Sequence, residues 1–449
     1  MAEQMMQHIA DELAVKQAIP AGYKQTEVGI IPNDWGVKCL GELVEISSGE
    51  SPSKFTFNLS GIPYFKVEQL NNGLVYAEST PYFIDSRKKI TSGSLIFPKR
   101  GASILLNKIR VLKYDSYMDT NLMTLTCSSE LNEFYLYNQL IYKELSSVAD
   151  TTSIPQINNK HIVPYTIPYP AKAEQIAIAT VLSDSDALIV GLEQLIAKKQ
   201  AIKTAAMQQL LTGRTRLPQF ALRSDGTPKG YKTSELGQIP EDWEIMPLVS
   251  IGRTIRGVSY NPNNDLYISD SSDSIRLFRS NNILNSRLVF SGLQYVSKNR
   301  VSESQKMQLG DILICMANGS KSLVGKSAIH DLNDGYEYTF GAFMGVFRLN
   351  DASQSKYVYY LMNSVRYRCY IDLILAGSSI NNLKPSDIDK LSLAFPDIEE
   401  QTAIAAMLSD MDSELAALEQ KLAKARDVKQ GMMQQLLTGR IRLPLPQEA

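Results

Sequence analysis

Apolar side chains recur every three or four residues over two long stretches of the chain, and these stretches define its plan. The first covers residues 173–211, where the apolar positions keep one heptad frame from Ile178 to Leu210. A second stretch keeps the same frame from Ile404 to Leu436. A sustained repeat of this kind is typical of helices that pack through a coiled-coil seam. The predicted seam contains Ile178, Leu182, Ile189, Leu192, Ile196, Leu210, Ile404, Leu408, Met411, Leu415, Leu418, Leu422 and Leu436.

Both stretches carry signals for helix boundaries. Asp397 together with Glu400 is typical of a cap at the start of the second helix. Gly213 and Gly439 follow the last apolar positions, where a residue in the left-handed conformation often ends a helix. A helix over 173–211 would be about 58 Å long at a rise of 1.5 Å per residue.

Charge follows the same order in both predicted helices, because the acidic residues come before the basic ones. An antiparallel pair would match the acidic half of each helix to the basic half of the other, and we predict that arrangement. The alternative is that each helix packs only on its own head and keeps a solvated charged face. The charges are Glu174, Asp184, Asp186, Glu193, Lys198, Lys199 and Lys203 in the first helix, and Glu399, Glu400, Asp410, Asp412, Glu414, Glu419, Lys421, Lys424, Arg426 and Lys429 in the second.

The helices belong to a larger internal repeat. Residues 20–35, PAGYKQTEVGIIPNDW, match residues 228–243, PKGYKTSELGQIPEDW, at ten of sixteen positions. Residues 170–218 match residues 396–444 at 27 of 49 positions, including an unbroken QQLLTGR. A period above 200 residues is too long for a solenoid and indicates a duplicated domain.

The segments between these repeats are far less alike and share only two weak landmarks. GSLIFPKRGAS at 93–103 corresponds to GDILICMANGS at 310–320. TSIPQINNKHI at 152–162 corresponds to SSINNLKPSDI at 378–388. Similar frames around dissimilar inserts predict one scaffold that carries two heads of different specificity.

Each head has strand-like and helix-like runs, which predict an α+β fold for both. The whole chain is therefore expected to be an α+β protein in which two heads are separated by two long antiparallel coiled-coil helices, with an internal two-fold repeat. Strands are expected at 62–67, 94–98, 121–127, 275–280, 311–316 and 342–349, and helices at 132–145 and 355–368. The predicted divisions are an N-terminal helical segment at 1–19, recognition domains at 20–169 and 219–395, and conserved helical segments at 170–218 and 396–449.

Composition narrows the class of protein. The formal net charge is −1 over 449 residues, so any basic surface must be local. The four cysteines form no C-x-x-C pair and there are only three histidines, so no metal site is predicted. The start of the chain is not a secretory signal, and no apolar run approaches the roughly 18 residues of a membrane span. We expect a soluble, cytoplasmic protein without a membrane partner.

Local basic clusters in the heads are the candidates for DNA contact, because Arg and Lys suit phosphates and guanine edges while Asn suits adenine edges. Turn formation explains many of the same Asn and Ser residues equally well. The candidates are Arg87, Lys88, Lys89, Lys99, Arg100, Lys108 and Arg110 in the first head, and Arg276, Arg279, Asn281, Asn282, Lys298, Arg300, Lys321 and Lys326 in the second.

Catalytic motifs are incomplete. The stretch from Gly319 to Ser327 resembles a phosphate-binding loop, but five residues separate its two glycines where the motif needs four. The chain contains no Pro-Pro pair of the kind found in the catalytic loop of amino-methyltransferases, and its D-x-K triplets lack acidic partners. We predict no catalytic residues in this chain.

The repeated GYKxxxxGxIPxDW segment, the EQxAIAxxLSDxD opening and the QQLLTGRxRLP ending together resemble the specificity subunits of Type I restriction-modification systems. The resemblance covers almost the whole chain. It implies that each head reads one half of a bipartite, asymmetric site on double-stranded DNA, through the major groove. It also implies that two modification subunits bind the conserved helices, and that restriction subunits join the complex.

S-adenosylmethionine and ATP would then be bound by the partner subunits, and this chain would hold no cofactor. Two other interpretations stay open from the sequence. One is the target-recognition subunit of a related Type II enzyme. The other is a non-catalytic DNA-binding scaffold, although two unequal heads are unusual for a repressor that binds a palindrome.

Overall fold

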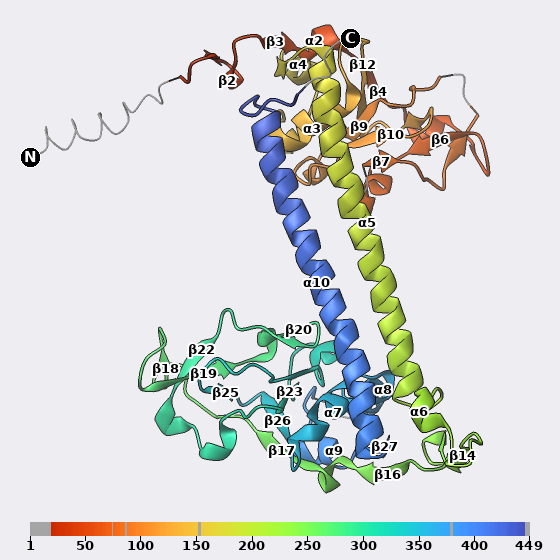
Figure 1. Cartoon of the computed structure of the whole chain (residues 1–449). Helices are drawn as coiled ribbons and strands as arrows, with labels where there is room; N and C mark the ends of the chain where they lie inside the picture. The colour runs from red at the N-terminus through yellow and green to blue at the C-terminus, as the bar shows by residue number, and fades with distance from the viewer. Residues whose placement is uncertain (1–18, 74, 86–87, 151–153, 378–379, 445–449) are drawn as a thin grey trace, which may run out of the picture. The chain divides into compact units, whose positions relative to one another are not determined.

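The computed structural model describes residues 19–444 except 74, 86–87, 151–153 and 378–379 (Figure 1). The predicted N-terminal helix before residue 19 and the DNA-contact candidate Arg87 lie outside the described residues. The chain divides into two units, one made of Met1–Leu195 with Leu418–Ala449 and the other of Ile196–Ala417. Each unit thus combines one head with a part of both conserved segments, whereas the sequence suggested consecutive divisions.

The two long helices are present as predicted. They are α5 (Lys172–Leu210) and α10 (Ile398–Leu436), each of 39 residues. Asp397 caps α10, because its carboxylate accepts a hydrogen bond from the backbone N–H of Glu400 at 2.8 Å. Gly213 and Gly439 follow the two helices with φ of 68° and 69°, so both glycines take the left-handed conformation that ends a helix.

Predicted seam residues lie on the less exposed face of each helix. In the first unit, Ile178 and Leu182 are 1% and 0% exposed and join the core of the head. In the second unit, Ile404 and Leu408 are equally buried. Toward the middle of the helices the predicted seam residues are buried or half-buried, namely Ile189, Leu192, Ile196, Met411, Leu415, Leu418 and Leu422.

Ion pairs join α5 to α10 inside each unit. In the first unit, Asp186 pairs with Lys429 at 2.5 Å and Glu193 with Arg426 at 2.6 Å. In the second unit, Lys199 pairs with Glu414 at 2.7 Å and Lys203 with Asp412 at 2.6 Å. Residue numbers rise along one helix as they fall along the other, and an acid faces a base in all four pairs.

The first head is built from two mixed sheets with short helices. One sheet has the order β4 (Val44–Ser48), β12 (Leu122–Cys127), β9 (Leu95–Pro98), β10 (Arg110–Leu112), β7 (Tyr76–Ala77). The other has the order β11 (Tyr117–Met118), β6 (Ile62–Phe65), β8 (Phe83–Ile84), β5 (Phe57–Asn58). Two-stranded sheets join β1 (Tyr23–Thr26) to β2 (Gly29–Pro32) and β13 (Thr166–Tyr169) to β3 (Gly36–Cys39), and the helices are α2 (Leu40–Leu43), α3 (Glu133–Lys143) and α4 (Asn159–Ile162).

The second head contains two four-stranded sheets. Their orders are β17 (Gly252–Arg256), β26 (Met344–Leu349), β23 (Ile312–Cys315), β24 (Ser327–Ile329) and β18 (Leu266–Tyr267), β22 (Gln294–Ser297), β19 (Ser274–Phe278), β25 (Tyr338–Phe340). Two-stranded sheets join β14 (Tyr231–Ser234) to β15 (Gly237–Pro240), β16 (Glu244–Pro247) to β27 (Ser392–Phe395) and β20 (Ile283–Leu284) to β21 (Arg287–Leu288). The helices are α6 (Pro218–Ala221), α7 (Ser355–Leu361), α8 (Val365–Ala376) and α9 (Pro385–Asp389).

Strand pairing in the second head follows that in the first. The order β4-β12-β9-β10 corresponds to β17-β26-β23-β24, and every pair in both runs is antiparallel. In the other sheet of each head, β6 pairs in parallel with β11 just as β19 does with β25. Two sequences with little similarity therefore form the same ladders, because both place buried apolar runs at matching points of the chain.

One predicted helix is wrong in its extent. The sequence suggested a single helix over 355–368, whereas the structure has α7 ending at Leu361 and α8 beginning at Val365. Ser364 causes the break, since its hydroxyl accepts a hydrogen bond from the backbone N–H of Tyr367 and so caps a new helix.

Helix α5 is long and apolar enough to cross a membrane by length and composition, which the sequence analysis did not predict. Its most apolar 18-residue window has a mean hydropathy of 1.4, and 22% of that window is buried. The same helix carries Asp184 and Asp186, and Asp186 pairs with Lys429. The paired charge, and the face that Ile178 and Leu182 bury in the core of the head, are features of a helix that packs against protein.

Candidate nucleic-acid interface

The most strongly repeated motifs meet in a clasp within each unit. In the second unit, Arg216 of the first TGRxRLP segment donates to both oxygens of Glu400, each at 2.6 Å, and to Asp242 at 2.8 and 3.1 Å. The indole N–H of Trp243 donates to Glu400 at 3.2 Å. The side chain of Glu400 is therefore held by the clasp and does not take part in the capping pair that the sequence suggested.

The first unit contains the same clasp, built from the other copies of the motifs. Arg442 donates to Glu174 and, at 3.0 and 2.9 Å, to Asp34, while Trp35 donates to Glu174 at 3.0 Å. The acid Glu174, which the sequence placed in the acidic half of the helix pair, belongs to this clasp instead. Because the GYK…DW hairpin and the TGRxRLP ending form one cluster, their repetition reflects a structural requirement.

Several predicted DNA-contact residues have partners inside their own head. Lys88 pairs with Glu50 at 2.7 Å and Lys89 with Asp115 at 2.7 Å. In the second head, Arg276 pairs with Asp270 and stacks 3.2 Å from the ring centre of Tyr336, Arg300 pairs with Asp265 at 2.9 Å, and Lys298 lies 3.9 Å from Glu337. Such ion pairs orient the loops. An exposed ion pair contributes little free energy, so the basic side chain can exchange its carboxylate partner for a phosphate at small cost.

Two of the candidates are enclosed. Arg110 is 7% exposed and donates to the carbonyl oxygens of Leu70 and Ile109. Asn282 is fully buried, and its amide donates to the carbonyl oxygens of Val289 and Ser291. Both side chains hold loops together from inside the heads, so neither is available to contact DNA.

The remaining candidates are less enclosed. Lys108 donates to Asn71 at 2.6 Å, and Lys326 donates to the carbonyl oxygen of Ile283 at 2.9 Å. Asn281 and Lys321 are exposed. Arg279 is half-buried, and in the described part of the chain its Nε atom is buried without a hydrogen-bond partner.

The two weak landmarks of the sequence meet in the structure. In the first head, residues 99–101 follow β9 and pair with residues 155–157 through two backbone bonds, Gly101 N–H to Pro155 O and Ile157 N–H to Lys99 O, both 2.9 Å. A third loop joins them, since Lys99 N–H donates to the carbonyl oxygen of Asn121 at 2.8 Å. We call this set, residues 99–101, 120–121 and 154–157, the first three-loop edge.

The second head has the same set at 316–318, 342–343 and 380–383, the second three-loop edge. Met316 N–H donates to Phe343 O at 2.9 Å, Leu383 N–H to Met316 O at 2.7 Å, and Asn318 N–H to Asn381 O at 3.3 Å. These three bonds correspond one for one to those of the first head. A rigid backbone frame with different side chains is what two heads of different specificity need.

The first edge carries positive charge, and both edges expose apolar surface. Lys99 and the exposed Arg100 are adjacent, and burial followed by repulsion from Arg100 lowers the pKa of Lys99. Ile154 and Ile380 stand at the same place in the two frames and are 61% and 62% exposed. The charge pattern of the sequence indicates Lys99 and Arg100 but not the uncharged members of both edges, since no composition signal distinguishes those from turn residues.

The stretch that resembled a phosphate-binding loop has the wrong structure for that role. A short 3₁₀ helix, η9 (Lys321–Leu323), follows its first glycine. Its last residue, Ser327, opens the strand β24, where a nucleotide-binding loop leads into a helix that faces the phosphates.

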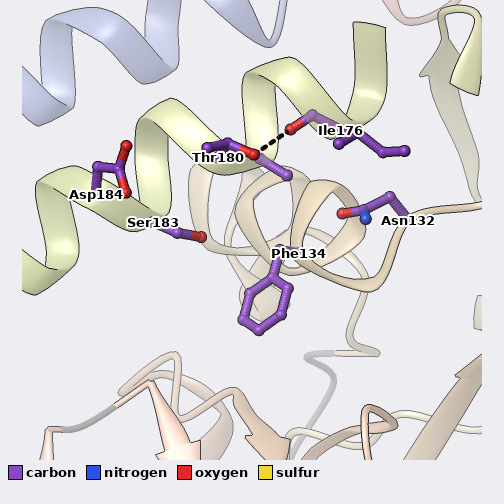
Figure 2. Close-up of a pocket in the computed structure, with 7 residues that line it drawn as sticks. Asn132, Phe134, Ile176, Thr180, Ser183 and Asp184 are labelled. Carbon is purple, nitrogen blue, oxygen red and sulfur yellow. Dashed lines mark hydrogen bonds between the residues drawn. The ribbon is translucent and has the colours of Figure 1, made fainter. Parts of the chain in front are cut away.

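A pocket of about 190 Å³ lies in the first unit where α3 meets the first turns of α5 (Figure 2). Thr180 donates to the carbonyl oxygen of Ile176 at 2.9 Å, as the dashed line marks. Ile176 is 46% exposed, so the pocket offers apolar surface to solvent. Its lining residues are Asn132, Phe134, Ile176, Ala179, Thr180, Ser183 and Asp184.

Comparison with known proteins identifies a family and a fold. The family model described as the Type I restriction modification DNA specificity domain matches twice, at residues 32–204 and 240–425. The specificity subunit of the Type I restriction enzyme EcoKI from Escherichia coli K12 is 40% identical over 189 residues, which cover 41% of this chain and 40% of that protein.

Other relatives align over nearly the full length at lower identity. The MjaVIII specificity subunit from Methanocaldococcus jannaschii is 23% identical over 427 residues, covering 92% of this chain and 94% of the relative. The crystal structure of a Type I S subunit from M. genitalium has a TM-score of 0.56 at 14% identity and covers 90% of this chain and 96% of that one. At 14% identity, the similarity to the M. genitalium structure shows a shared fold alone.

Proposed function

The chain belongs to the family of the Type I restriction modification DNA specificity domain, and on that premise we propose that it is the DNA sequence-specificity subunit of a Type I restriction-modification complex. The observation that carries the proposal is the double match of the DNA specificity domain, because one match covers each head. The matching strand ladders of the two heads support the same conclusion. Each head then reads one half of a bipartite, asymmetric DNA site.

The two long helices form an antiparallel coiled coil that sets the spacing between the half-sites. Support comes from the two 39-residue helices, the burial of their predicted seam and the four ion pairs of matched sign. The internal two-fold repeat then has a physical purpose, since each clasp ties the end of one long helix to the head of the other copy. Because the repeat gives both units the same clasp, two copies of one partner subunit would meet equivalent surfaces.

Two modification subunits bind the conserved helices, and restriction subunits join that complex. Apolar side chains outside the seam support a docking role, because they would otherwise face water. Leu188, Ile202 and Met407 are 58%, 45% and 39% exposed, and the pocket beside Ile176 adds a recess near the start of α5. This chain contributes no catalytic residue, and the partner subunits bind S-adenosylmethionine and ATP.

The test is co-expression of the full chain with its modification subunit, followed by mapping of methylated positions in the host DNA. A single bipartite, asymmetric motif is expected. A control chain lacks the second head through deletion of residues 244–391. Methylation of the same motif without the chain, or methyl transfer by the purified chain alone, would contradict the proposal.

Exchange of one head tests whether each head reads its own half-site. Residues 36–165 are replaced by the corresponding head of a relative while both long helices are kept. We expect one half of the motif to change and the other half to stay. A change in both halves would mean that the heads do not act independently.

A further inference from the structure

The ladder registers place Asn121 and Phe343 at the same position of the two heads. Met123 of β12 is paired with Phe97 and Ser48, while Gly345 of β26 is paired with Ile314 and Arg256. Counting back two residues from each strand leads to Asn121 and Phe343. Each accepts the backbone hydrogen bond from the loop that follows the neighbouring strand, at 2.8 Å from Lys99 and at 2.9 Å from Met316.

Both side chains are exposed although their backbones are fixed. Phe343 is 71% exposed, and Asn121 belongs to the exposed part of its turn. An exposed phenylalanine ring contributes little to the fold, and apolar surface that gathers at one edge is typical of a binding site. The Ile380 side chain, 62% exposed, belongs to the same three-loop edge.

Neighbouring groups hold the two turns in place. The backbone N–H of Asn121 donates to the carboxylate of Asp119 at 2.7 Å, and Asp119 is 6% exposed. The Asn121 side chain also donates a hydrogen bond to this carboxylate, which orients the amide and leaves its second N–H and its carbonyl oxygen for a base. In the second head, Arg256 donates to the carbonyl oxygens of Ala342 and Leu383, at 3.4 and 2.6 Å. Side chains presented from such rigid turns are positioned well enough to distinguish one base pair from another.

The chemistry of the two side chains differs in a way that suits different bases. An Asn amide can both donate to and accept from the edge of adenine, whereas an apolar ring fits the methyl group of thymine. Exposed basic side chains that would meet the phosphates belong to the first edge or follow the second in sequence: Arg100 lies on the first three-loop edge, and Lys321 follows Asn318 by three residues.

We propose that Asn121 and Phe343 are specificity-determining residues at matched positions of the two heads, with Asn121 reading an adenine and Phe343 contacting a thymine methyl group. The inference rests on the proposed function, because it needs both heads to bind DNA. It adds the assignment of one named position per head and a chemical class of base for each.

The experiment compares methylated motifs in cells that carry the modification subunit and the full chain with Asn121→Ala, Phe343→Ala or Phe343→Leu. Asn33→Ala and Leu373→Ala serve as matched controls, since Asn33 is exposed in the first unit and Leu373 is 74% exposed in the second. Thermal unfolding of each purified chain confirms that the exposed substitutions leave the fold intact.

We expect Asn121→Ala to relax one adenine position of one half-site by about 5- to 150-fold in discrimination, and Phe343→Ala to relax one thymine position of the other half-site by a similar factor. Phe343→Leu retains an apolar contact and should keep the thymine. Unchanged motifs in both alanine variants, or an equal loss at every base of both halves, would overturn the assignment. If the unmodified chain directs no bipartite motif, the proposed function fails instead.

Discussion

Arg442 donates two hydrogen bonds to the carboxylate of Glu174, although 268 positions separate them along the chain. Arg216 and Glu400 form the equivalent pair in the second unit, 184 positions apart. Each pair joins the segment after one long helix to the first turn of the other. The repeated sequence is thereby explained by contacts between copies, since both copies supply residues to each clasp.

The two clasps should differ in strength. In the second, the side chains of Arg216 and Glu400 are 6% and 1% exposed, whereas in the first Arg442 is 40% exposed. Removal of a buried partner leaves an uncompensated charge and costs about 3–5 kcal/mol. We therefore expect Arg216→Ala to lower the free energy of unfolding of its unit by that amount, and Arg442→Ala to cost less because water reaches the vacated site.

Intrinsic fluorescence can follow each clasp separately. The chain has two tryptophans, and Trp35 and Trp243 lie one in each clasp, 1% and 0% exposed. Denaturant unfolding is measured in Trp35→Phe and Trp243→Phe backgrounds, so that one signal reports one unit. Equal losses in the two alanine variants would contradict the role that we assign to burial.

Acid should weaken the second clasp through Asp242. Burial favours the protonated carboxyl, but hydrogen bonds from Arg216 and Lys229 outweigh it and lower the pKa of Asp242 to about 2 from 3.8. A carboxyl with a lowered folded-state pKa contributes stability above the unfolded-state pKa and loses it as the pH falls through the folded-state pKa. The contribution is thus complete above about pH 4 and lost toward about pH 2.

The measurement is the unfolding midpoint of the Trp243 transition between pH 5 and pH 2. Asp242→Asn should reduce stability near pH 5 and flatten the acid dependence, because the titrating group is gone. Asp225→Asn is the comparison outside the clasp, since hydrogen bonds from Thr227 also lower the pKa of Asp225, but in an exposed loop, and this variant should flatten the profile less than Asp242→Asn. A profile of equal steepness in the Asp242 variant would contradict the assignment.

The helices and several strands were predictable because their signal is local. A heptad frame fixes which face of α5 is buried, and a glycine after the last turn fixes its end. Five predicted strands and α3 lie within the expected runs, and β19 begins one residue earlier than expected. Strands are predictable in this way because alternating or continuous apolar residues bounded by polar turns identify a strand without knowledge of its neighbours.

Candidate DNA-reading residues were not predictable in the same way. The sequence pointed to Arg110, which is enclosed, and gave no signal for Asn121, which precedes a strand in an ordinary turn. Only the pairing of strands distant in sequence reveals that Asn121 and Phe343 are equivalent. Charge identifies residues that are able to bind a phosphate, whereas position in a shared backbone frame depends on long-range contacts.

Within the first unit, the helix pair should depend on the half-buried ion pair more than on the exposed one. Lys429 and Asp186 are 13% and 18% exposed, against 58% and 43% for Arg426 and Glu193. A double-mutant cycle with Lys429→Ala and Asp186→Ala should give a coupling of about 1 kcal/mol or more, and the exposed pair about 0–1 kcal/mol. Unfolding is followed by Trp35, and a larger coupling for the exposed pair would contradict the prediction.

The lengths of the two long helices should set the distance between the half-sites. Seven residues, one heptad, are inserted into α5 after Leu195 and seven into α10 after Ala417, where the two units divide the helices. Each unit keeps its own ion pairs, because Asp186 with Lys429 and Lys203 with Asp412 stay on their original sides. The heptad also keeps the apolar seam on the inner face.

Each helix becomes about 10.5 Å longer, which corresponds to about three base pairs at 3.4 Å each. We expect the methylated motif to keep both half-sites and to gain about three base pairs of spacer. A control with three inserted residues in each helix turns the seam away from its partner and should weaken assembly. If the heptad variant methylates DNA with the original spacer, the partner subunits rather than the helices position the heads.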